Sequence, residues 1–364
     1  MKILFVITSL RVGGAERMVA EMAPYIARFD NRVDLFLFDR TETPLLKALE
    51  REPVDILPAP KGAFQMWNPL HIFRLRKLIK KGNYDIIHTH NSPAQILGAL
   101  SCPSHKTILI TTEHNTTNKR RQHFFLRWLD SFIYKAYDHI VCVSNKTLDN
   151  LIGTVAINPD KVTVIRNGID ISKYSPEAKP ELSESVPQIM PGDKIILMTG
   201  AFRKQKDQPT LIRAMALLPS NYKLWLAGGW NLKEKAEMLV NSLGLNHRIF
   251  FLGIRDDIPA LMQIADVNVL SSHYEGMPVS AVEAMASGKP FIASDVPGIS
   301  DIVGDAAWLV PEADPPALAK AIHDVIENPV LSDKISNKCM EKATQFDIKN
   351  TIIEHISLYQ NLCR

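Results

Sequence analysis

Short apolar runs recur along the chain, and each is followed by a polar stretch with helical periodicity. The runs are rich in β-branched residues and lack the alternation of a half-exposed strand, which is typical of parallel strands buried on both faces. Strands are expected at 2–8, 32–38, 84–90, 107–112, 139–144, 161–165, 194–200, 222–228, 247–253, 265–271, 289–294 and 306–310. Because parallel strands must be joined by a crossover, the stretches between them predict βαβ units.

The spacing of these strands predicts two domains. The stretch between the sixth and seventh strands carries four prolines and cannot build a core. We therefore expect doubly wound domains at 1–175 and 193–345, a linker at 176–192 and a terminal helix within 346–364. Ligands bind beyond the carboxyl ends of parallel strands. Two such sheets facing each other across a cleft would suit the joining of two substrates.

Composition indicates an ordinary globular protein. The chain has 364 residues, of which 46% are hydrophobic and 22% charged, and this excludes a disordered or fibrous protein. The four cysteines are far apart and form no ligand-spaced pair, which is typical of reduced thiols in the cytoplasm. The apolar run at the N-terminus is too short to span a membrane, and no later run approaches about 18 residues. We expect a cytoplasmic protein.

Basic residues gather in the first domain. Residues 61–135 hold twelve lysines and arginines against three acidic residues. Within them, 71–82 and 119–128 interleave the charges with Phe, Leu and Trp, which fits an anionic membrane surface or a phosphorylated acceptor. Amphipathic helices with solvated basic faces would give the same pattern. No nucleic-acid motif accompanies it, so we expect no nucleic acid as a partner. With a membrane as partner, the protein would be peripheral on the inner face.

A glycine pair follows the first strand and opens a helix. Gly13 and Gly14 let backbone N–H groups approach a phosphate or a sugar at the positive end of the helix dipole. A dinucleotide-binding domain is an alternative, and Asp39 stands near the position of its ribose-binding acid. The GxGxxG pattern of that domain is absent, because no third glycine follows. A purely structural turn is a further alternative.

The most specific pattern lies in 271–298, where a strand is followed by a turn and a helix. Pro278 suits the first helical position, and the free N–H groups after it offer a phosphate site. Two carboxylates eight residues apart can face different hydroxyls of one ligand, and carboxylates accept strong hydrogen bonds from sugar hydroxyls. Taken alone, the pattern also fits an ordinary helix N-terminus. The predicted nucleotide-sugar contacts are Glu275, Gly276, Met277, Val279, Ser280 and Glu283.

Two more loops of the second domain follow strands. Arg203 and Lys206 can neutralise a leaving diphosphate, although basic residues this close together also suit a solvated loop. After a later strand, a nucleobase can be held by backbone groups of Gly253, Ile254 and Arg255.

Histidines lie at or just after the ends of two expected strands of the first domain. His114 suits hydrogen bonding to substrate hydroxyls, whereas His88 suits a structural role. No carboxylate stands at a matching interval, so a metal bound by these histidines or by His90 is unsupported. We expect no metal and no cofactor besides the nucleotide-sugar co-substrate.

These motifs read, in order, GGAER, TEHN, VSN, RNGID, FRKQKD and an ExxxxxxxE element from Glu275 to Glu283. In this order, over nearly the full chain, they make it resemble the retaining nucleotide-sugar glycosyltransferases of family 4. The resemblance implies the GT-B fold, an α/β architecture of two Rossmann-like domains. The first domain would bind the acceptor and the second the nucleotide sugar, and the terminal helix would cross back to the first domain.

The resemblance also implies roles for single residues. Gly14 lies beside the donor diphosphate and the acceptor, and Lys206 binds the diphosphate. Glu283 binds the ribose hydroxyls of the nucleotide. Glu275 and His114 contact the transferred sugar.

One position departs from the family pattern. Ala201 stands where an arginine is common, and Arg203, two residues later, is the candidate for the missing charge. With Glu275, His114 and Lys206 it completes the residues expected to act in catalysis.

The implied reaction moves a sugar from a nucleoside diphosphate, expected to be UDP, to an acceptor hydroxyl with retention at the anomeric carbon. Lys and Arg would take the place of a metal. The expected acceptor is a lipid-linked or cell-surface polysaccharide precursor. A nucleotide-sugar epimerase of the same fold and a non-catalytic nucleotide-sugar or glycan-binding protein are the alternatives.

Overall fold

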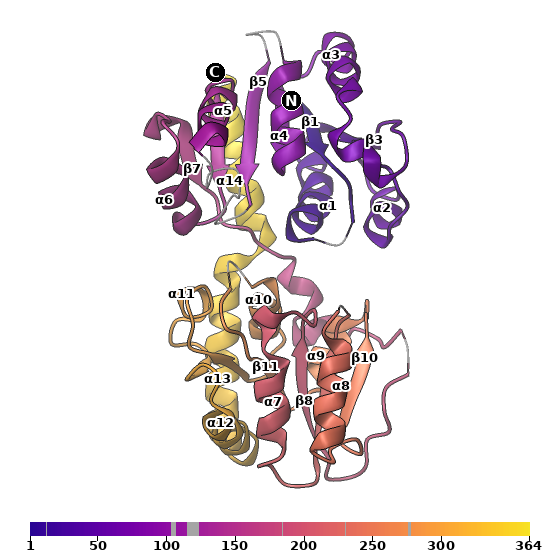
Figure 1. Cartoon of the computed structure of the whole chain (residues 1–364), viewed down its shortest axis with the longest axis vertical. Coiled ribbons are helices and arrows are strands. Elements are labelled where there is room, and N and C mark those ends of the chain that lie inside the picture. Colours follow the sequence, from indigo (N-terminus) through magenta and orange to yellow (C-terminus); the bar gives the residue numbers. More distant parts are fainter. Residues whose placement is uncertain (12, 103–106, 115–123, 184, 230, 276–277) are drawn as a thin grey trace. The chain divides into compact units, whose positions relative to one another are not determined.

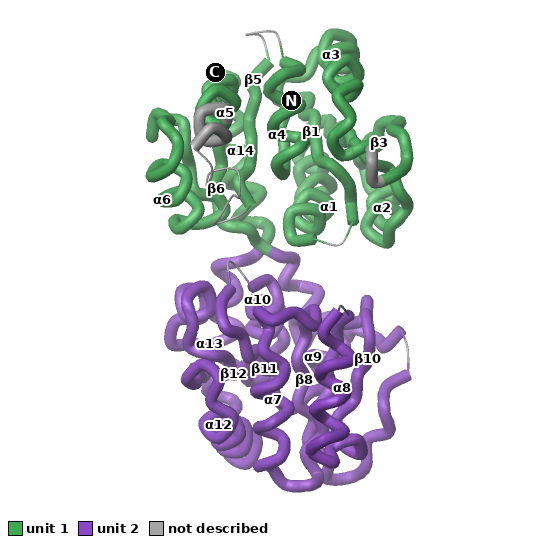
Figure 2. Tube along the Cα trace, in the orientation of Figure 1, with its two compact units in different colours: residues 1–168, 348–364 green, residues 169–347 purple. Residues whose placement is uncertain are grey.

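The chain folds into two units, each built on one parallel sheet. The computed structural model describes residues 1–11, 13–102, 107–114, 124–183, 185–229, 231–275 and 278–364. Unit 1 comprises Met1–Gly168 with Ile348–Arg364, and unit 2 comprises Ile169–Asp347 (Figure 2). Strands and helices alternate in both (Figure 1), so the prediction of two doubly wound α/β domains is confirmed.

The sheet of unit 1 has the order β3-β2-β1-β4-β5-β6-β7 within the described residues, and each neighbouring pair is parallel. The order reverses between β1 and β4. The very short β3 was not expected, because two residues carry no periodic signal. The strands are β1 (Lys2–Ile7), β2 (Arg32–Leu37), β3 (Asp55–Ile56), β4 (Ile86–His90), β5 (Ile108–Glu113), β6 (His139–Cys142) and β7 (Val162–Val164).

Helices cover both faces of this sheet. Successive residues of a strand point to opposite faces, so Phe5 packs with Met18 and Tyr359 under α1 and α14, while Val6 packs with Leu75 and other residues of α3 to α6. The helices are α1 (Gly14–Ala27), α2 (Pro44–Leu49), α3 (Leu70–Gly82), α4 (Ser92–Ser101), α5 (Phe124–Lys135), α6 (Asn145–Thr154) and α14 (Ile348–Leu362), with 3-10 turns η1 (Ala63–Trp67) and η3 (Pro159–Lys161).

The sheet of unit 2 has the order β10-β9-β8-β11-β12-β13, again parallel, and reverses between β8 and β11. The strands are β8 (Lys194–Thr199), β9 (Tyr222–Ala227), β10 (Ile249–Gly253), β11 (Val267–Leu270), β12 (Phe291–Ser294) and β13 (Trp308–Val310). The helices are α7 (Gln208–Met215), α8 (Lys233–Ser242), α9 (Ile258–Ile264), α10 (Val279–Ala286), α11 (Ser300–Val303), α12 (Pro315–Glu327) and α13 (Pro329–Ala343), and the 3-10 turns are η4 (Ile171–Lys173), η5 (Pro176–Ala178), η6 (Lys204–Lys206) and η7 (Thr344–Phe346).

The boundary between the units differs from the one expected after residue 175. Ile169 and Tyr174 are buried in the core of unit 2, and the Ile169 N–H donates to the Phe346 carbonyl at 2.9 Å. The proline-rich stretch also belongs to unit 2, where the Ser183 N–H donates to Asp257 Oδ2 at 2.9 Å. The apolar residues of 169–175 thus place this segment in unit 2, although it follows the last strand of unit 1 directly.

Candidate functional site

A polar cluster lies where β8 and β11 end, at the reversal of strand order in unit 2. The ammonium of Lys206, in the turn after β8, is 2.6 Å from Oε1 of Glu275, in the loop after β11. Ser272 donates to the same oxygen and Gln205 donates to Oε2, both at 2.9 Å. Ligands of open parallel sheets bind at such a reversal. The structure therefore brings Lys206 and Glu275, from two separate motifs, into one candidate site.

No sequence signal marks Gln205 and Ser272 as members of this cluster. Gln205 also connects the two loops. Its side-chain amide donates to the backbone carbonyl of Tyr274 at 3.0 Å, and its backbone carbonyl accepts from the His273 N–H at 2.9 Å. Amide and hydroxyl side chains occur throughout the chain and carry no charge. Sequence reasoning therefore missed both residues.

Glycines allow the loops beneath Lys206 to approach closely. Gly228 has a φ of 156°, and a Cβ there would lie 2.1 Å from the Gly200 carbonyl oxygen. Such a contact is impossible for any other residue without a shift of the backbone. The side-chain carbons of Lys206 lie in turn against Gly200, 3.5 Å or more from the position of a Cβ. Gly228 therefore lets the two loops meet, and the side chain of Lys206 packs on Gly200 at ordinary contact distance.

The cations expected at this site differ in exposure. The side chain of Lys206 is only 16% exposed, whereas Arg203 and Lys204 are exposed. Arg203 is the N-cap residue of η6, and its N–H donates to the Ala201 carbonyl at 2.8 Å. Arg203 thus begins the same turn that ends in Lys206, close to the Ala201 position that lacks an arginine.

The helix expected after residue 277 is α10, which begins at Val279. Pro278 is its N-cap residue, one position earlier than expected. The N–H groups of Val279 and Ser280 lie in the first turn, where the helix offers them no carbonyl. The Ser280 hydroxyl is buried without a partner in the described part of the chain. Gly276 and Met277 lie outside the described residues.

Glu283, in the second turn of α10, is buried and hydrogen-bonded. The Tyr174 hydroxyl donates to its Oε1 at 2.5 Å, across 109 positions of sequence. The sequence marks Glu283 through its spacing from Glu275, but no motif marks Tyr174. Glu275 and Glu283 therefore have different partners, a lysine for one and a tyrosine for the other.

The loop after β10 uses its arginine internally. Arg255 donates to both carboxylate oxygens of Asp257, at 2.8 and 2.6 Å, and to the Ser185 carbonyl at 3.1 Å. The hydrogen bond from Arg255 lowers the pKa of Asp257 to about 2. Gly253 has a φ of 74°, and Ile254 is 79% exposed. The guanidinium thus holds the loop in place. Because Arg255 is engaged in this way, the loop would contact a nucleobase through its backbone groups.

In unit 1, the glycine pair lies at the reversal between β1 and β4. Gly13 is the extended N-cap residue of α1, and Gly14 is its exposed first residue. A Cβ on Gly13 would lie 2.1 Å from Oε2 of Glu16, so this carboxyl group takes the space of a side chain. Burial raises the pKa of Glu16, while a hydrogen bond from Asn91 at the end of β4 opposes that rise.

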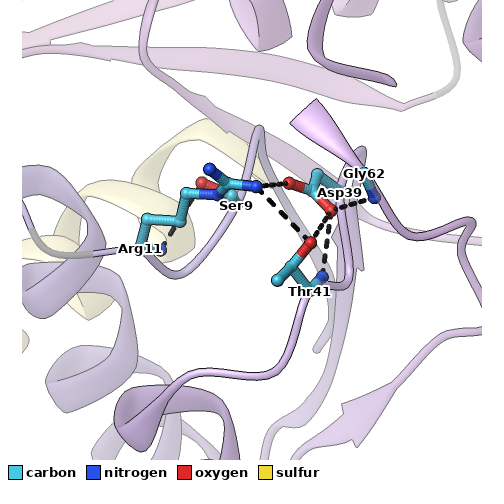
Figure 3. A network of polar contacts seen from close by, with 5 residues as sticks. All are labelled: Ser9, Arg11, Asp39, Thr41 and Gly62. Atoms are coloured by element: carbon cyan, nitrogen blue, oxygen red, sulfur yellow. Dashed lines mark hydrogen bonds and ion pairs between the residues drawn. The ribbon is translucent and has the colours of Figure 1, made fainter. Parts of the chain in front are cut away.

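Asp39 anchors the loop that leads into the glycine pair (Figure 3). It is fully buried, and it accepts hydrogen bonds from the Arg11 guanidinium at 2.9 Å, the Thr41 hydroxyl at 2.6 Å and the Gly62 N–H at 2.7 Å. Burial by itself raises the pKa of Asp39, but the hydrogen bonds from Thr41, Gly62 and Arg11 together hold it below its ordinary value. The carboxylate is therefore used inside the protein, which disfavours the dinucleotide alternative.

Three histidines of unit 1, His88, His90 and His114, lie together, and burial favours the neutral form of each. His114 Nε2 is 3.0 Å from His90 Nδ1, and His88 contacts the hydroxyls of Thr112 at 2.7 Å and Tyr359 at 2.6 Å. Burial lowers the pKa of His114 to about 4 and holds those of His88 and His90 well below 6.5. The two hydroxyl partners favour the structural role for His88. The second ring nitrogen of His114 is buried and has no partner within the described ranges.

The described residues bring together no group of three or more His, Cys, Asp or Glu side chains that would hold a metal ion. They also include no helix with the length and apolarity needed to cross a membrane.

The chain is similar to two curated glycosyltransferases and to a solved structure. The UDP-Gal:alpha-D-GlcNAc-diphosphoundecaprenol alpha-1,3-galactosyltransferase of Escherichia coli is 27% identical over 303 residues, 79% of this chain and 78% of that one. The N-acetylgalactosamine-N,N'-diacetylbacillosaminyl-diphospho-undecaprenol 4-alpha-N-acetylgalactosaminyltransferase of Campylobacter jejuni is 24% identical and covers 94% of each chain. The crystal structure of Anabaena HepE in complex with UDP-glucose matches with a TM-score of 0.80 at 22% identity, over 99% of this chain and 100% of that one.

Each half of the chain also matches a family model. Residues 12–173 match the model described as Glycosyltransferase Family 4, and residues 181–346 match the model described as Glycosyl transferases group 1. The structural likeness shows the GT-B fold that the motifs implied. Since the two models together span nearly the whole chain, in the order of its two units, the chain belongs to the family 4 glycosyltransferases.

Proposed function

We propose that this glycosyltransferase moves a sugar from UDP to a hydroxyl of a lipid-linked glycan precursor, with retention at the anomeric carbon. The contact of Lys206 with Glu275 at the reversal of strand order in unit 2 carries the proposal. It places a cation for a diphosphate beside a carboxylate for sugar hydroxyls, where α/β sheets bind ligands. UDP as the nucleotide is supported by the likeness to a structure solved with UDP-glucose.

In this proposal unit 2 binds the donor. Lys206 and Arg203 neutralise the diphosphate together with the N–H groups of the first turn of α10. Glu283 accepts hydrogen bonds from the ribose hydroxyls, and Glu275 contacts the transferred sugar. The donor-binding set of unit 2 is completed by Gly253, Ile254, Arg255, Gly276, Met277, Val279 and Ser280.

The proposed chemistry needs no enzymic nucleophile. The diphosphate departs, the acceptor hydroxyl attacks the same face of the sugar, and a leaving phosphate oxygen takes the acceptor proton. The C–O bond to the diphosphate breaks as the C–O bond to the acceptor forms. The protein lowers the barrier by stabilising the charge that develops on the diphosphate and by orienting both substrates. No metal or cofactor is required in this scheme, because cationic side chains and helix N–H groups supply the positive charge.

Unit 1 is the proposed acceptor unit. The two enzymes named above act on diphosphoundecaprenol-linked sugars, which supports a lipid-linked acceptor here. Gly13 and Gly14 lie at the reversal between β1 and β4, where this unit would receive its ligand. A role of His114 at the transferred sugar stays a prediction.

Helix α3 supports a place at an anionic membrane surface. Trp67, just before the helix, is 57% exposed, and Leu70 and Phe73 on the helix are 54% and 66% exposed. Lys77 and Lys81 continue the exposed side at helical spacing. An exposed apolar group next to cations suits a bilayer of anionic lipids, and we propose that α3 rests on the inner face. The second basic segment, 119–128, lies outside the described residues as far as residue 123.

Incubation with labelled UDP-sugars and GlcNAc-diphosphoundecaprenol tests the proposed function. A larger lipid-linked glycan with an α-linked product from an α-linked donor is the expected result. An isomerised sugar nucleotide would instead indicate an epimerase, and donor that is bound but unchanged with every acceptor would indicate a binding protein. A β-linked product would overturn retention alone.

A further inference from the structure

A tyrosine distant in sequence holds the carboxylate of Glu283. The Tyr174 hydroxyl donates to Glu283 Oε1 at 2.5 Å, and both residues are at least nine-tenths buried. A buried carboxylate needs hydrogen-bond donors, because burial without them is costly. A donor of fixed position also selects one rotamer of the glutamate among those that α10 allows. The direction in which Glu283 presents its carboxylate therefore depends on Tyr174.

Tyr174 is itself held firmly within unit 2. Gln263 donates to the carbonyls of Tyr174 and Ser175 at 2.9 and 2.6 Å, and the Tyr174 N–H donates to the Ile171 carbonyl at 3.0 Å. Pro176, which follows Ser175, packs close to the end of α10. A Cβ on Gly288, just after this helix, would lie 2.3 Å from Cγ of Pro176. The segment thus contacts α10 at two places and presents the hydroxyl from a rigid backbone.

We propose that Tyr174 is a positioning residue of the nucleotide site, which holds the Glu283 carboxylate so that it accepts hydrogen bonds from the ribose hydroxyls. This inference rests on the proposed function, in which Glu283 binds the ribose. A carboxylate has two oxygens with about four acceptor sites, so a bond to Tyr174 is compatible with bonds to a ribose. The tyrosine acts through the glutamate and is not expected to touch the nucleotide.

Unit 2 contains a matched control for this pair. The Tyr222 hydroxyl donates to Glu327 Oε1 at 2.7 Å, and Tyr222 is 1% exposed. Tyr222 begins β9, so it lies at the amino edge of the sheet, opposite the edge where ligands bind. Tyr174→Phe and Tyr222→Phe therefore remove the same chemical group and the same type of hydrogen bond, one near the candidate site and one away from it.

Calorimetric titration with UDP and with its 2′- and 3′-deoxy analogues tests the proposal in the full chain. Tyr174→Phe should weaken UDP binding about tenfold, as expected when a hydrogen bond to a charged group is lost. It should also reduce the preference of the protein for UDP over the deoxy analogues, as Glu283→Gln should. Tyr222→Phe should leave both quantities at the wild-type value, and melting temperatures should show that all three variants are folded.

The outcomes separate this inference from the function on which it rests. Wild-type affinity in Tyr174→Phe would overturn the inference and leave the donor site intact. Weaker binding with an unchanged preference for UDP over the deoxy analogues would also overturn it, because the effect of Tyr174 on binding would then not depend on the ribose hydroxyls. If the wild-type protein binds none of UDP, ADP and GDP, the proposed function and the inference both fall.

Discussion

The ammonium of Lys206 lies 2.6 Å from Oε1 of Glu275, and both side chains are mostly covered by protein. The pair joins the turn after β8 to the loop after β11. A diphosphate bound here would compete with Glu275 for the ammonium of Lys206. Glu275 would then accept hydrogen bonds from sugar hydroxyls in place of its contact with the lysine. The two residues are therefore coupled, and a change in one is expected to alter what the other does.

Lys206→Ala should abolish most of the donor affinity. We expect UDP-sugar binding to fall by a factor of about 10 to 100, since a charge-assisted contact to the diphosphate is worth about 1.5–3 kcal/mol. Calorimetric titration with UDP measures this. Lys204→Ala removes an exposed lysine from the same turn and serves as the control. Equal affinity in the two variants would reject the assignment of Lys206.

Glu275→Gln should separate binding from catalysis. The amide keeps the size of the side chain but no longer holds Lys206 by charge, so UDP affinity should stay the same or rise. The transfer rate should fall about 100-fold, as when an oriented polar group in an active site is lost. Calorimetric titration with UDP measures the affinity, and steady-state kinetics with UDP-sugar measures the rate. A loss of UDP affinity with an unchanged rate would contradict this division of roles.

Gly228→Ala should disturb the contact between the loops of Gly228 and Gly200, next to Lys206. A Cβ at this position would lie 2.1 Å from the Gly200 carbonyl, and the residue has a φ of 156°, which disfavours a side chain. We expect a loss of stability of about 2–4 kcal/mol together with weaker donor binding. Gly153→Ala, in α6 with open space around it, is the control and should be neutral or slightly stabilising. Thermal melts of both variants measure the difference.

Acid should destabilise unit 1 through its buried histidines. Burial lowers the pKa of His355 to about 4, while its ordinary pKa is 6.5. Between these values the unfolded chain binds more protons than the folded one, so the free energy of unfolding falls as the pH falls through this window. Each unit of pKa depression corresponds to about 1.4 kcal/mol.

His355→Gln removes one of these groups. The stability difference between wild type and this variant should shrink as the pH falls from about 7 to about 5, because the wild type alone loses the contribution of a neutral His355. Denaturant unfolding at each pH measures it. His247→Gln, which removes an exposed histidine of unit 2, serves as the control. A difference that stays constant for His355→Gln would refute the proposed linkage.

Substitutions on α3 should weaken attachment to anionic vesicles. Trp67→Ser with Phe73→Ser removes exposed apolar groups, and Lys77→Glu with Lys81→Glu reverses the charge. Each pair should lower the bound fraction on phosphatidylglycerol vesicles at least severalfold, and binding of the wild type should weaken with salt. Met238→Ser, which alters an exposed residue of unit 2, should bind like wild type. Salt-independent binding, or none, would count against a membrane surface at α3.

The strands and most of the candidate site could be predicted from local patterns. An apolar run that is buried on both faces is visible in neighbouring residues alone, so every expected strand is present within a few residues of its expected bounds. Lys206, Glu275 and Glu283 could be chosen because ligands bind where parallel strands end. The short β3 and the start of unit 2 at Ile169 could not be predicted from the sequence, because neither depends on a periodic run of apolar residues.

What the sequence by itself determined is the alternation of strand and helix, and with it two parallel sheets with polar loops at their carboxyl ends. The partners of the polar side chains were decided only by the tertiary structure. Asp39 accepts a hydrogen bond from Arg11, so it is not free to bind a ribose, and Glu283 accepts a hydrogen bond from Tyr174. Periodicity reports the burial of a residue from its neighbours along the chain, whereas these contacts depend on which distant loops the strand order brings together.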